Sequence, residues 1–285
     1  MSLNATRLQA YRDHTYRRTR DRRVRTHQAA VEFINERGFV YFWPVRGIEL
    51  PSLWVAAAGE RPVPAEHDDP GHITWEWKDS LLGTRQVFYA HVLRGRATFI
   101  ALDELPWFYA LSENYGLPES DYQEQYAAGR LTTTAKQIYE ALLENGPLDT
   151  LNLRRAARLT AADSSARFER ALVELQRDFK ILPVGIAAVG AWRYAYVYEL
   201  VARWWPHLAE QARPLGRTAA QAHLLARYLQ AVGAITEVQA QRLFQWSTAD
   251  MQRAVDRLVQ EESAWRAAKV AGEQGRWLVI PELNR

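Results

Sequence analysis

The chain has 285 residues, of which 36 are Lys or Arg and 33 are Asp or Glu, so its formal net charge is only +3. Hydrophobic residues make up 48% of the sequence and charged residues 24%, ordinary globular values that argue against a disordered or fibrous chain. The absence of cysteine excludes disulfide bonds, thiolate zinc sites, iron–sulfur clusters and a cysteine nucleophile.

Positive charge is concentrated at the start of the sequence. Residues 1–27 hold eight arginines and two acidic residues, a local charge of +6, while the rest of the chain sums to −3. We therefore predict that residues 1–25 form a basic arm that lies along phosphates or enters a minor groove, the alternative being a solvated tail. The arginines expected to contact DNA do not fall on one side of a helix: Arg17, Arg18, Arg20, Arg22, Arg23 and Arg25.

The next segment, residues 26–104, is expected to form a first module. A helical pattern from Thr26 ends at Gly38, and two further helices are predicted at residues 51–59 and 72–82. Two strand-like runs then meet at a turn formed by Arg94 and Gly95 and predict a β-hairpin. Three helices followed by a hairpin are typical of a winged helix, a helix-turn-helix with a β-hairpin wing.

The same order of elements is predicted twice more, after a linker at residues 105–131 that contains two prolines and two glycines. The second module comprises residues 132–204 and the third residues 205–285. We therefore predict an α+β, mainly helical fold of three tandem winged-helix domains. Because this fold is used mostly on nucleic acid, we favour duplex DNA as the partner; the alternative is a transcriptional regulator or a protein-interaction module whose wings contact protein partners.

In the first module, the third predicted helix carries the residues closest to chemistry. Its periodicity predicts that Ile73, Trp77 and Leu81 are buried. The open side is then left with one aromatic and three charged residues: Trp75, Glu76, Lys78 and Asp79. Such a tryptophan would stack on a base that has left the duplex while one of the carboxylates activates water. Alternatively, Trp75 packs under the loop at 60–71 and Lys78 pairs with a neighbouring acid.

Neither a metal nor a cofactor is expected. Residues 66–69 and His72 offer carboxylate and imidazole donors, but their spacing matches no metal-site signature, and no glycine loop for phosphates or HExxH motif is present.

The uncharged stretch at 181–192 has 12 residues, too few to span a bilayer, and residues 1–27 lack the apolar run of a signal peptide. We expect a cytoplasmic protein with no membrane partner, associated with the nucleoid if it binds DNA.

Residues 38–45, with the sequence GFVYFWPV, and the Leu53-Trp54 pair that follows resemble a motif of the winged-helix DNA glycosylases that unhook interstrand crosslinks, the AlkZ and YcaQ type. In that family, a Gln and an Asp or Gln that activate water stand where this chain has Tyr41 and Trp43. The resemblance implies tandem winged helices that bind DNA and, in the family, a monofunctional N-glycosyl hydrolase.

A phenol of ordinary pKa and an indole cannot replace a carboxylate or an amide in that reaction. We therefore expect a divergent DNA-binding member of the family without its base-excision chemistry. In this interpretation, an aromatic cluster replaces the catalytic pair, and four residues join the arm in contacting DNA: Tyr41, Trp43, Trp75 and Lys78. The alternative is an active glycosylase for alkylated bases that uses a different acid, Glu76 or Asp79.

Overall fold

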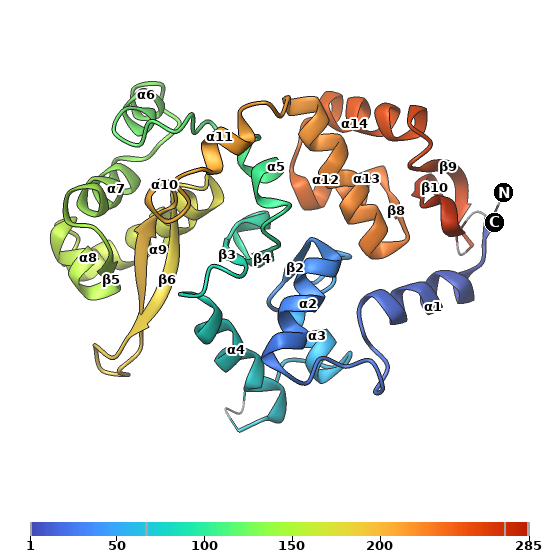
Figure 1. Cartoon of the computed structure of the whole chain (residues 1–285), viewed down its shortest axis with the longest axis horizontal. Helices are drawn as coiled ribbons and strands as arrows, with labels where there is room; N and C mark the ends of the chain where they lie inside the picture. Colours follow the sequence, from blue (N-terminus) through green and yellow to red (C-terminus); the bar gives the residue numbers. More distant parts are fainter. Residues whose placement is uncertain (1, 66–67, 271, 284–285) are drawn as a thin grey trace.

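A computed structural model describes residues 2–65, 68–270 and 272–283 of the chain. Within these residues, the order helix, strand, helix, helix, strand, strand occurs three times (Figure 1). The first unit contains α2 (His27–Arg37), β2 (Phe39–Tyr41), α3 (Leu53–Ala58), α4 (Ile73–Leu81), β3 (Phe88–His91) and β4 (Ala97–Ile100). The second contains α7 (Thr133–Asn145), β5 (Leu148–Asp149), α8 (Thr150–Ala156), α9 (Ser165–Arg177), β6 (Ile181–Ala187) and β7 (Ala195–Leu200). The third contains α12 (Arg217–Val232), β8 (Ala234–Thr236), α13 (Glu237–Phe244), α14 (Thr248–Gln260), β9 (Trp265–Val270) and β10 (Glu273–Val279).

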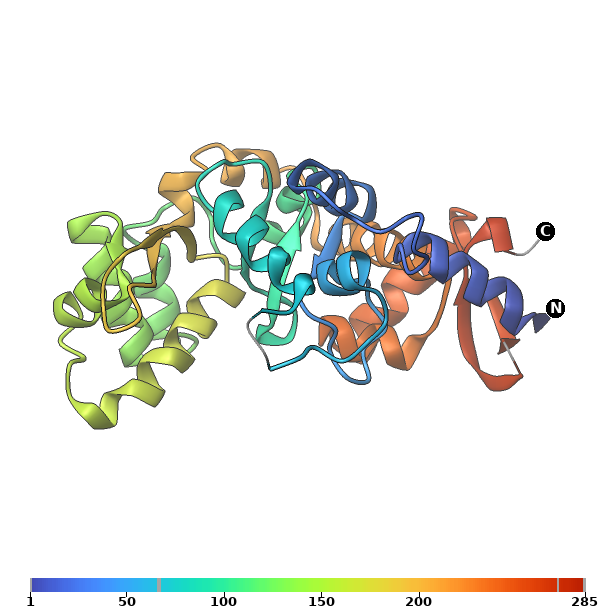
Figure 2. The same cartoon turned by 90° about the horizontal axis from the view of Figure 1, so that it is seen from below.

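The remaining elements precede, join, lie within or follow these units. They are β1 (Ser2–Leu3), α1 (Ala5–Thr15), α5 (Leu105–Tyr109), α6 (Asp121–Ala127), α10 (Val201–Trp204) and α11 (Leu208–Ala212), with 3-10 turns η1 (Pro70–His72), η2 (Leu93–Gly95), η3 (Ala162–Ser164) and η4 (Pro281–Leu283). Figure 2 shows the three units side by side, with the first unit in the middle. The fold is α+β, with more residues in helices than in strands. None of the described helices is long and apolar enough to cross a membrane.

Each unit has a small antiparallel sheet with the same connectivity. The short first strand pairs with the last strand of the hairpin, which gives the orders β2-β4-β3 and β5-β7-β6; in the third unit β8 likewise pairs with β10. The two-residue strand β1 extends that third sheet by pairing in parallel with β9. The first strands of two or three residues were not expected from the sequence, because so short a segment has no periodicity of its own and forms a strand only beside its partner.

Local capping signals set the helix boundaries as expected. The Thr26 hydroxyl accepts from the backbone of Ala29 at the start of α2, and Gly38 ends this helix at a φ of +81°. Thr236 and Gln239 form a capping box at the start of α13. These interactions lie within a few residues of each other along the chain, so the sequence alone predicts them.

The strand β2 is buried on both faces because the first unit packs against the third. Phe39 and Tyr41 belong to a hydrophobic core shared by these two units, where the ring centroids of Phe39 and Phe244 are 6.1 Å apart. Val40 and Phe42 face the opposite way, into the first unit's own core. The second unit has a separate core.

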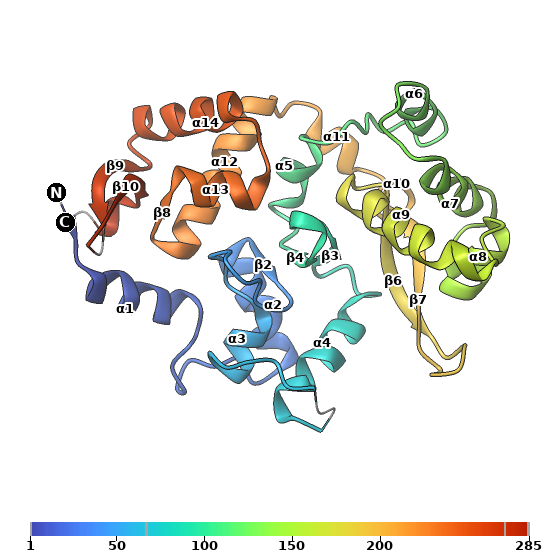
Figure 3. The same ribbon diagram turned by 180° about the vertical axis from the view of Figure 1, so that it is seen from behind.

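Before the first unit, the N-terminal segment forms a helix that packs on the third unit. Figure 3 shows α1 leading from the β9–β10 hairpin towards α2 and α3. The Tyr11 hydroxyl donates to the carbonyl of Gln230 at 2.5 Å. The Arg12 guanidinium donates to the carbonyls of Val232 and Ala234 and pairs with Glu49 at 3.1 Å. Residues 5–15 are therefore an ordered bridge between the third unit and the loop that follows β2.

The β3–β4 turn packs closely against α9 of the second unit, and this contact can be tested at Gly95. At its φ of +65°, a Cβ on Gly95 would lie 2.9 Å from Val173 Cγ1. Gly95→Ala is expected to lower the free energy of unfolding by about 1 kcal/mol for the backbone conformation and by a further 1 to 3 kcal/mol or so for the clash. Thermal and urea unfolding measure the loss.

The control variant is Gly129→Ala. Gly129 has a similar φ of +71°, but no described atom lies within 4 Å of the added Cβ. Only the backbone cost of about 1 kcal/mol is expected there. Equal losses in the two variants would contradict the contact between the turn and α9.

Candidate functional site

One cleft between the first and second units collects four of the residues expected to carry function, all of them from the first unit. It lies between α4 and the β6–β7 hairpin, two elements that are neighbours in Figure 1. Its volume is about 1110 Å³, and it is open to solvent. Its described lining is mainly apolar with two carboxylates, and the residues that matter most are Trp43, Trp75, Glu76, Asp79, Trp192 and Tyr194.

Two tryptophans that the sequence singled out meet at this cleft. The Trp43 ring is 37% exposed and stacks on Phe42 at a centroid distance of 5.2 Å. Trp75, which is half-buried, meets Trp43 edge-on at 5.5 Å. Across the cleft, Trp192 at the hairpin turn is 92% exposed. These indole faces offer flat apolar surfaces of the kind on which a planar ring stacks.

Lys78 lies fully buried beneath this aromatic wall. Its Nζ donates to the hydroxyls of Tyr194 at 2.8 Å and Tyr196 at 2.5 Å, and it pairs with Asp79 at 2.7 Å. The same ammonium lies 4.3 Å from the centroid of the Trp75 ring, a cation–π contact. The buried charge is thus satisfied by groups from both units.

Two positions on α4 differ from the helical pattern. Lys78 was placed on the open side and is buried, whereas Ile73 was placed in the buried stripe and is 40% exposed. The physical reason is that the β6–β7 hairpin of the second unit covers one face of α4, and the periodicity of a helix does not reveal which of its faces another unit covers. The pairing of Lys78 with a neighbouring acid, the alternative considered above, is confirmed at Asp79.

The two carboxylates of the cleft differ in whether other side chains already bond to their oxygens. Asp79 accepts from the Tyr194 hydroxyl at 2.8 Å in addition to its pair with Lys78. Burial, the neighbouring Tyr196 and Asp79 itself raise the pKa of Tyr194, so this phenol stays a hydrogen-bond donor. Glu76 is exposed and forms no hydrogen bond or ion pair with any residue that the structure describes. Glu76 is therefore the carboxylate available to a ligand.

Tyr41 and Trp43, the pair at the motif positions, point to different places. Tyr41 is fully buried in the core shared with the third unit, and its hydroxyl donates to the carbonyl of Leu93 at 3.4 Å. Burial raises the pKa of Tyr41 to about 12, so the phenol keeps its proton at neutral pH. Trp43 lines the cleft, where its indole can donate a hydrogen bond but cannot accept one.

The arm arginines fall into two groups. Arg17 and Arg18 form ion pairs with Glu36 at 2.9 Å and Glu60 at 3.3 Å. Arg23 is half-buried against the end of α3, next to Gly59. The other three are exposed and have no acidic partner among the described residues: Arg20, Arg22 and Arg25. Of these, Arg25 donates to the carbonyl of Arg20 at 3.0 Å, but none of the three forms an ion pair among the described residues, so their charges are open to a polyanion.

The residues of the second unit that complete the cleft were missed from the sequence. Tyr194 directly precedes β7, and Tyr196 and Tyr198 follow at every second position within it; this period of two was the available signal. Their partner on α4, Lys78, lies more than 110 residues away, which no local pattern reports.

The metal donors considered at residues 66–69 include Glu66 and His67, which lie outside the described residues. Among the residues that are described, no group of three His, Asp or Glu side chains could hold a metal ion.

Comparisons with known proteins place this arrangement in context. The sequence model of the family described as AlkZ related matches residues 24–245, more than half of the chain. Among solved structures, the chain is similar to the DNA glycosylase AlkZ of Streptomyces sahachiroi, with a TM-score of 0.56 and 15% identity over 99% of this chain and 71% of that chain. At this identity the likeness shows the fold alone. The search of curated proteins gives no match.

The structural role of Lys78 can be tested by Lys78→Ala. This change removes the donor to Asp79 and to two tyrosine hydroxyls and leaves a cavity. A loss of about 2 to 4 kcal/mol in the free energy of unfolding is expected, measured by urea titration with tryptophan fluorescence as the signal.

The matched control is Lys136→Ala, which removes a lysine from the surface of α7 and its ion pair with Glu140. A pair within one turn of an exposed helix contributes little, so a much smaller loss is expected. If both variants lost the same stability, Lys78 would not anchor the hairpin to α4.

Proposed function

Because this chain belongs to the AlkZ-related family, whose model matches residues 24–245, we propose that it is a DNA-binding relative of crosslink-repair DNA glycosylases that does not use the family's base-excision chemistry. The partner in this proposal is duplex DNA. The observation that carries the proposal is the placement of Tyr41 and Trp43: neither the buried, neutral phenol nor the indole can activate water.

We further propose that the three units are winged-helix domains, at residues 26–104, 132–204 and 205–285, with a linker at 105–131. The repeated helix–strand–helix–helix–strand–strand order and the common sheet connectivity support this interpretation. In a winged helix, the helix before the hairpin enters a groove of the duplex. Here, the β6–β7 hairpin covers one face of α4 and the β3–β4 turn packs against α9, so α14 is the better candidate for that role.

Within this proposal, the arm and the aromatic cleft have separate roles. The exposed guanidinium groups of Arg20, Arg22 and Arg25 lie along phosphates. Trp43 and Trp75 stack on a base or on a planar group attached to the DNA. Lys78 acts as a positioning residue, since it holds the hairpin wall of the cleft and is itself buried.

An active glycosylase is the second candidate, and the free carboxylate in the cleft favours it. Glu76 lies on α4 beside Trp75 and, among the described residues, has no partner that would compete for its proton-accepting oxygens. A cationic alkylated base stacked on the tryptophans would be attracted by this charge, and Glu76 would activate water against its glycosidic bond. Asp79 is less suited because Lys78 and Tyr194 already occupy its oxygens.

A protein-interaction or transcription-regulating module is the third candidate. The almost fully exposed Trp192 at the tip of the β6–β7 hairpin is the feature that favours it, because exposed aromatic residues are enriched at protein interfaces. In either DNA-binding proposal the expected location is the cytoplasm, on the nucleoid. These alternatives are separated by whether the protein binds DNA and by whether it releases a base.

Binding to a fluorescently labelled duplex, followed by anisotropy at salt concentrations of about 50 and about 200 mM, tests the DNA proposal. The affinity is expected to fall steeply with salt because each neutralised phosphate releases counterions. The triple variant Arg20→Gln, Arg22→Gln, Arg25→Gln should reduce the slope of log affinity against log salt by about two to three. Binding that does not respond to salt would contradict both DNA-binding candidates; an unchanged slope in the variant would remove the arm from the proposal.

Incubation with DNA that carries bulky N7-alkylpurines, followed by detection of abasic sites, separates the first two candidates. No base release above the protein-free rate is expected. Release that Glu76→Gln abolishes, and that Glu119→Gln at an exposed carboxylate on another segment leaves unchanged, would establish the glycosylase instead.

A further inference from the structure

Five exposed arginines lie in or next to the segments through which the three units contact one another. One follows β2, one lies in the β3–β4 turn and one directly after it, one ends α9 and one lies on α13. We call these five residues the junction patch: Arg46, Arg94, Arg96, Arg177 and Arg242. They are separated by up to 196 positions in sequence, and neither the arm nor the aromatic cleft includes any of them.

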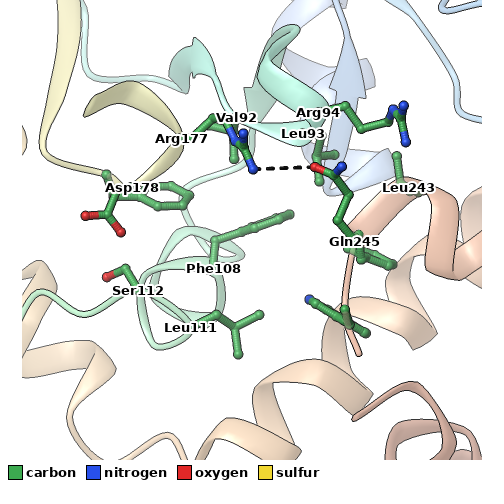
Figure 4. Close-up of a pocket in the computed structure, with 13 residues that line it drawn as sticks. Val92, Leu93, Arg94, Phe108, Leu111, Ser112, Arg177, Asp178, Leu243 and Gln245 are labelled. Atoms are coloured by element: carbon green, nitrogen blue, oxygen red, sulfur yellow. Dashed lines mark hydrogen bonds between the residues drawn. The ribbon is translucent and has the colours of Figure 1, made fainter. Parts of the chain in front are cut away.

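Hydrogen bonds between the units hold the patch together. The Arg94 guanidinium in the β3–β4 turn donates to the carbonyl of Arg242 at 2.6 Å, and Arg242 donates to the carbonyl of Gly47, next to Arg46, at 3.3 Å. Figure 4 shows Arg177 of α9 donating to Gln245 after α13, at 3.4 Å, across a small pocket. Each of these bonds joins two units, so the positions of the arginines depend on how the units pack.

The guanidinium groups of Arg94, Arg177 and Arg242 bond to neutral oxygens. None of the five forms an ion pair with an Asp or Glu that the structure describes, whereas Arg12, Arg17 and Arg18 on the arm do. One of the described residues that line the pocket of Figure 4 is acidic, Asp178, and its carboxylate is paired with Lys180 at 3.2 Å. Glu169, Glu174 and Asp178 line a neighbouring surface hollow together with Arg177, but none of them forms an ion pair with it. The positive charge of the patch is therefore not neutralised by any ion pair among the described residues.

Keeping like charges close together costs free energy, which a polyanion offsets when it binds. Guanidinium groups suit phosphodiesters because each presents several donors in one plane and stays charged at any physiological pH. Two residues here, Arg94 at a φ of +56° and Gln245 at +58°, adopt the left-handed conformation that side chains other than glycine rarely take. The turn and the end of α13 thus hold an unfavourable backbone conformation at the patch.

We propose that the junction patch binds the phosphodiester backbone of DNA, so that a single duplex contacts all three units at once. This inference rests on the proposed DNA-binding function and adds to it the surface that contacts the phosphodiester backbone. It also gives the packing of the units a function: the first unit supplies the loop and the turn, and the other two supply one helix end each.

The test is a triple variant, Arg46→Gln, Arg96→Gln and Arg177→Gln. It leaves in place the two bonds that tether Arg94 and Arg242 to backbone carbonyls, so the units are expected to stay packed. Each lost phosphate contact lowers the slope of log affinity against log salt by about 0.9 for duplex DNA. We expect a slope reduced by about two to three and a thermal midpoint close to that of the original protein.

A variant with the same loss of charge is the control. Arg155, Arg158 and Arg213 are exposed, have no acidic partner among the described residues and lie on α8, just after it, and after α11. Changing these three to Gln should leave the slope unchanged. Equal slopes in the junction and control variants, whether both reduced or both unchanged, would overturn the inference while the proposed function stands. If the original protein shows no salt-dependent binding, the proposed function fails first.

Discussion

The buried ammonium of Lys78 is the constraint on which the arrangement of the cleft depends. A charge that is fully removed from water is tolerated only where hydrogen bonds and an opposite charge replace its hydration. Here Asp79 comes from the same helix, and the hydroxyls of Tyr194 and Tyr196 come from the second unit. The hairpin must therefore lie against α4, and the aromatic cleft beside it exists because it does.

The packing of the third unit against β2 is a second constraint, and it acts on the other side of the first unit. The strand has apolar neighbours on both faces, since the third unit covers the face that an isolated module would expose. Tyr41 is consequently locked in a core, while Trp43, two residues on and past the end of the strand, reaches the cleft. The side chains of Tyr41 and Trp43 therefore do not line the same cleft. In the proposed function, the cleft binds by stacking and not by a pair of water-activating groups.

Much of the fold could be predicted from the sequence because its signals are local. Caps such as Thr26, stop signals such as Gly38 and the turn at Arg94 and Gly95 act within a few residues, and they delimit helices and hairpins close to where the structure has them. The first strand of each unit could not be predicted, since two or three residues become a strand only beside a distant partner. The docking of α1 was also missed, although Leu8, Tyr11 and Thr15 stand at helical spacing.

By itself, the sequence determined the order of the helices and the hairpin in each unit, their threefold repetition and the resemblance to the AlkZ type, because periodicity, caps and motifs are properties of neighbouring residues. Only the tertiary structure decided which side chains meet. It buried Lys78 among tyrosines of another unit, left Glu76 free, and brought five arginines from three units to one junction. The physical reason is that burial and polar pairing act through space, and their partners can lie more than two hundred residues apart along the chain.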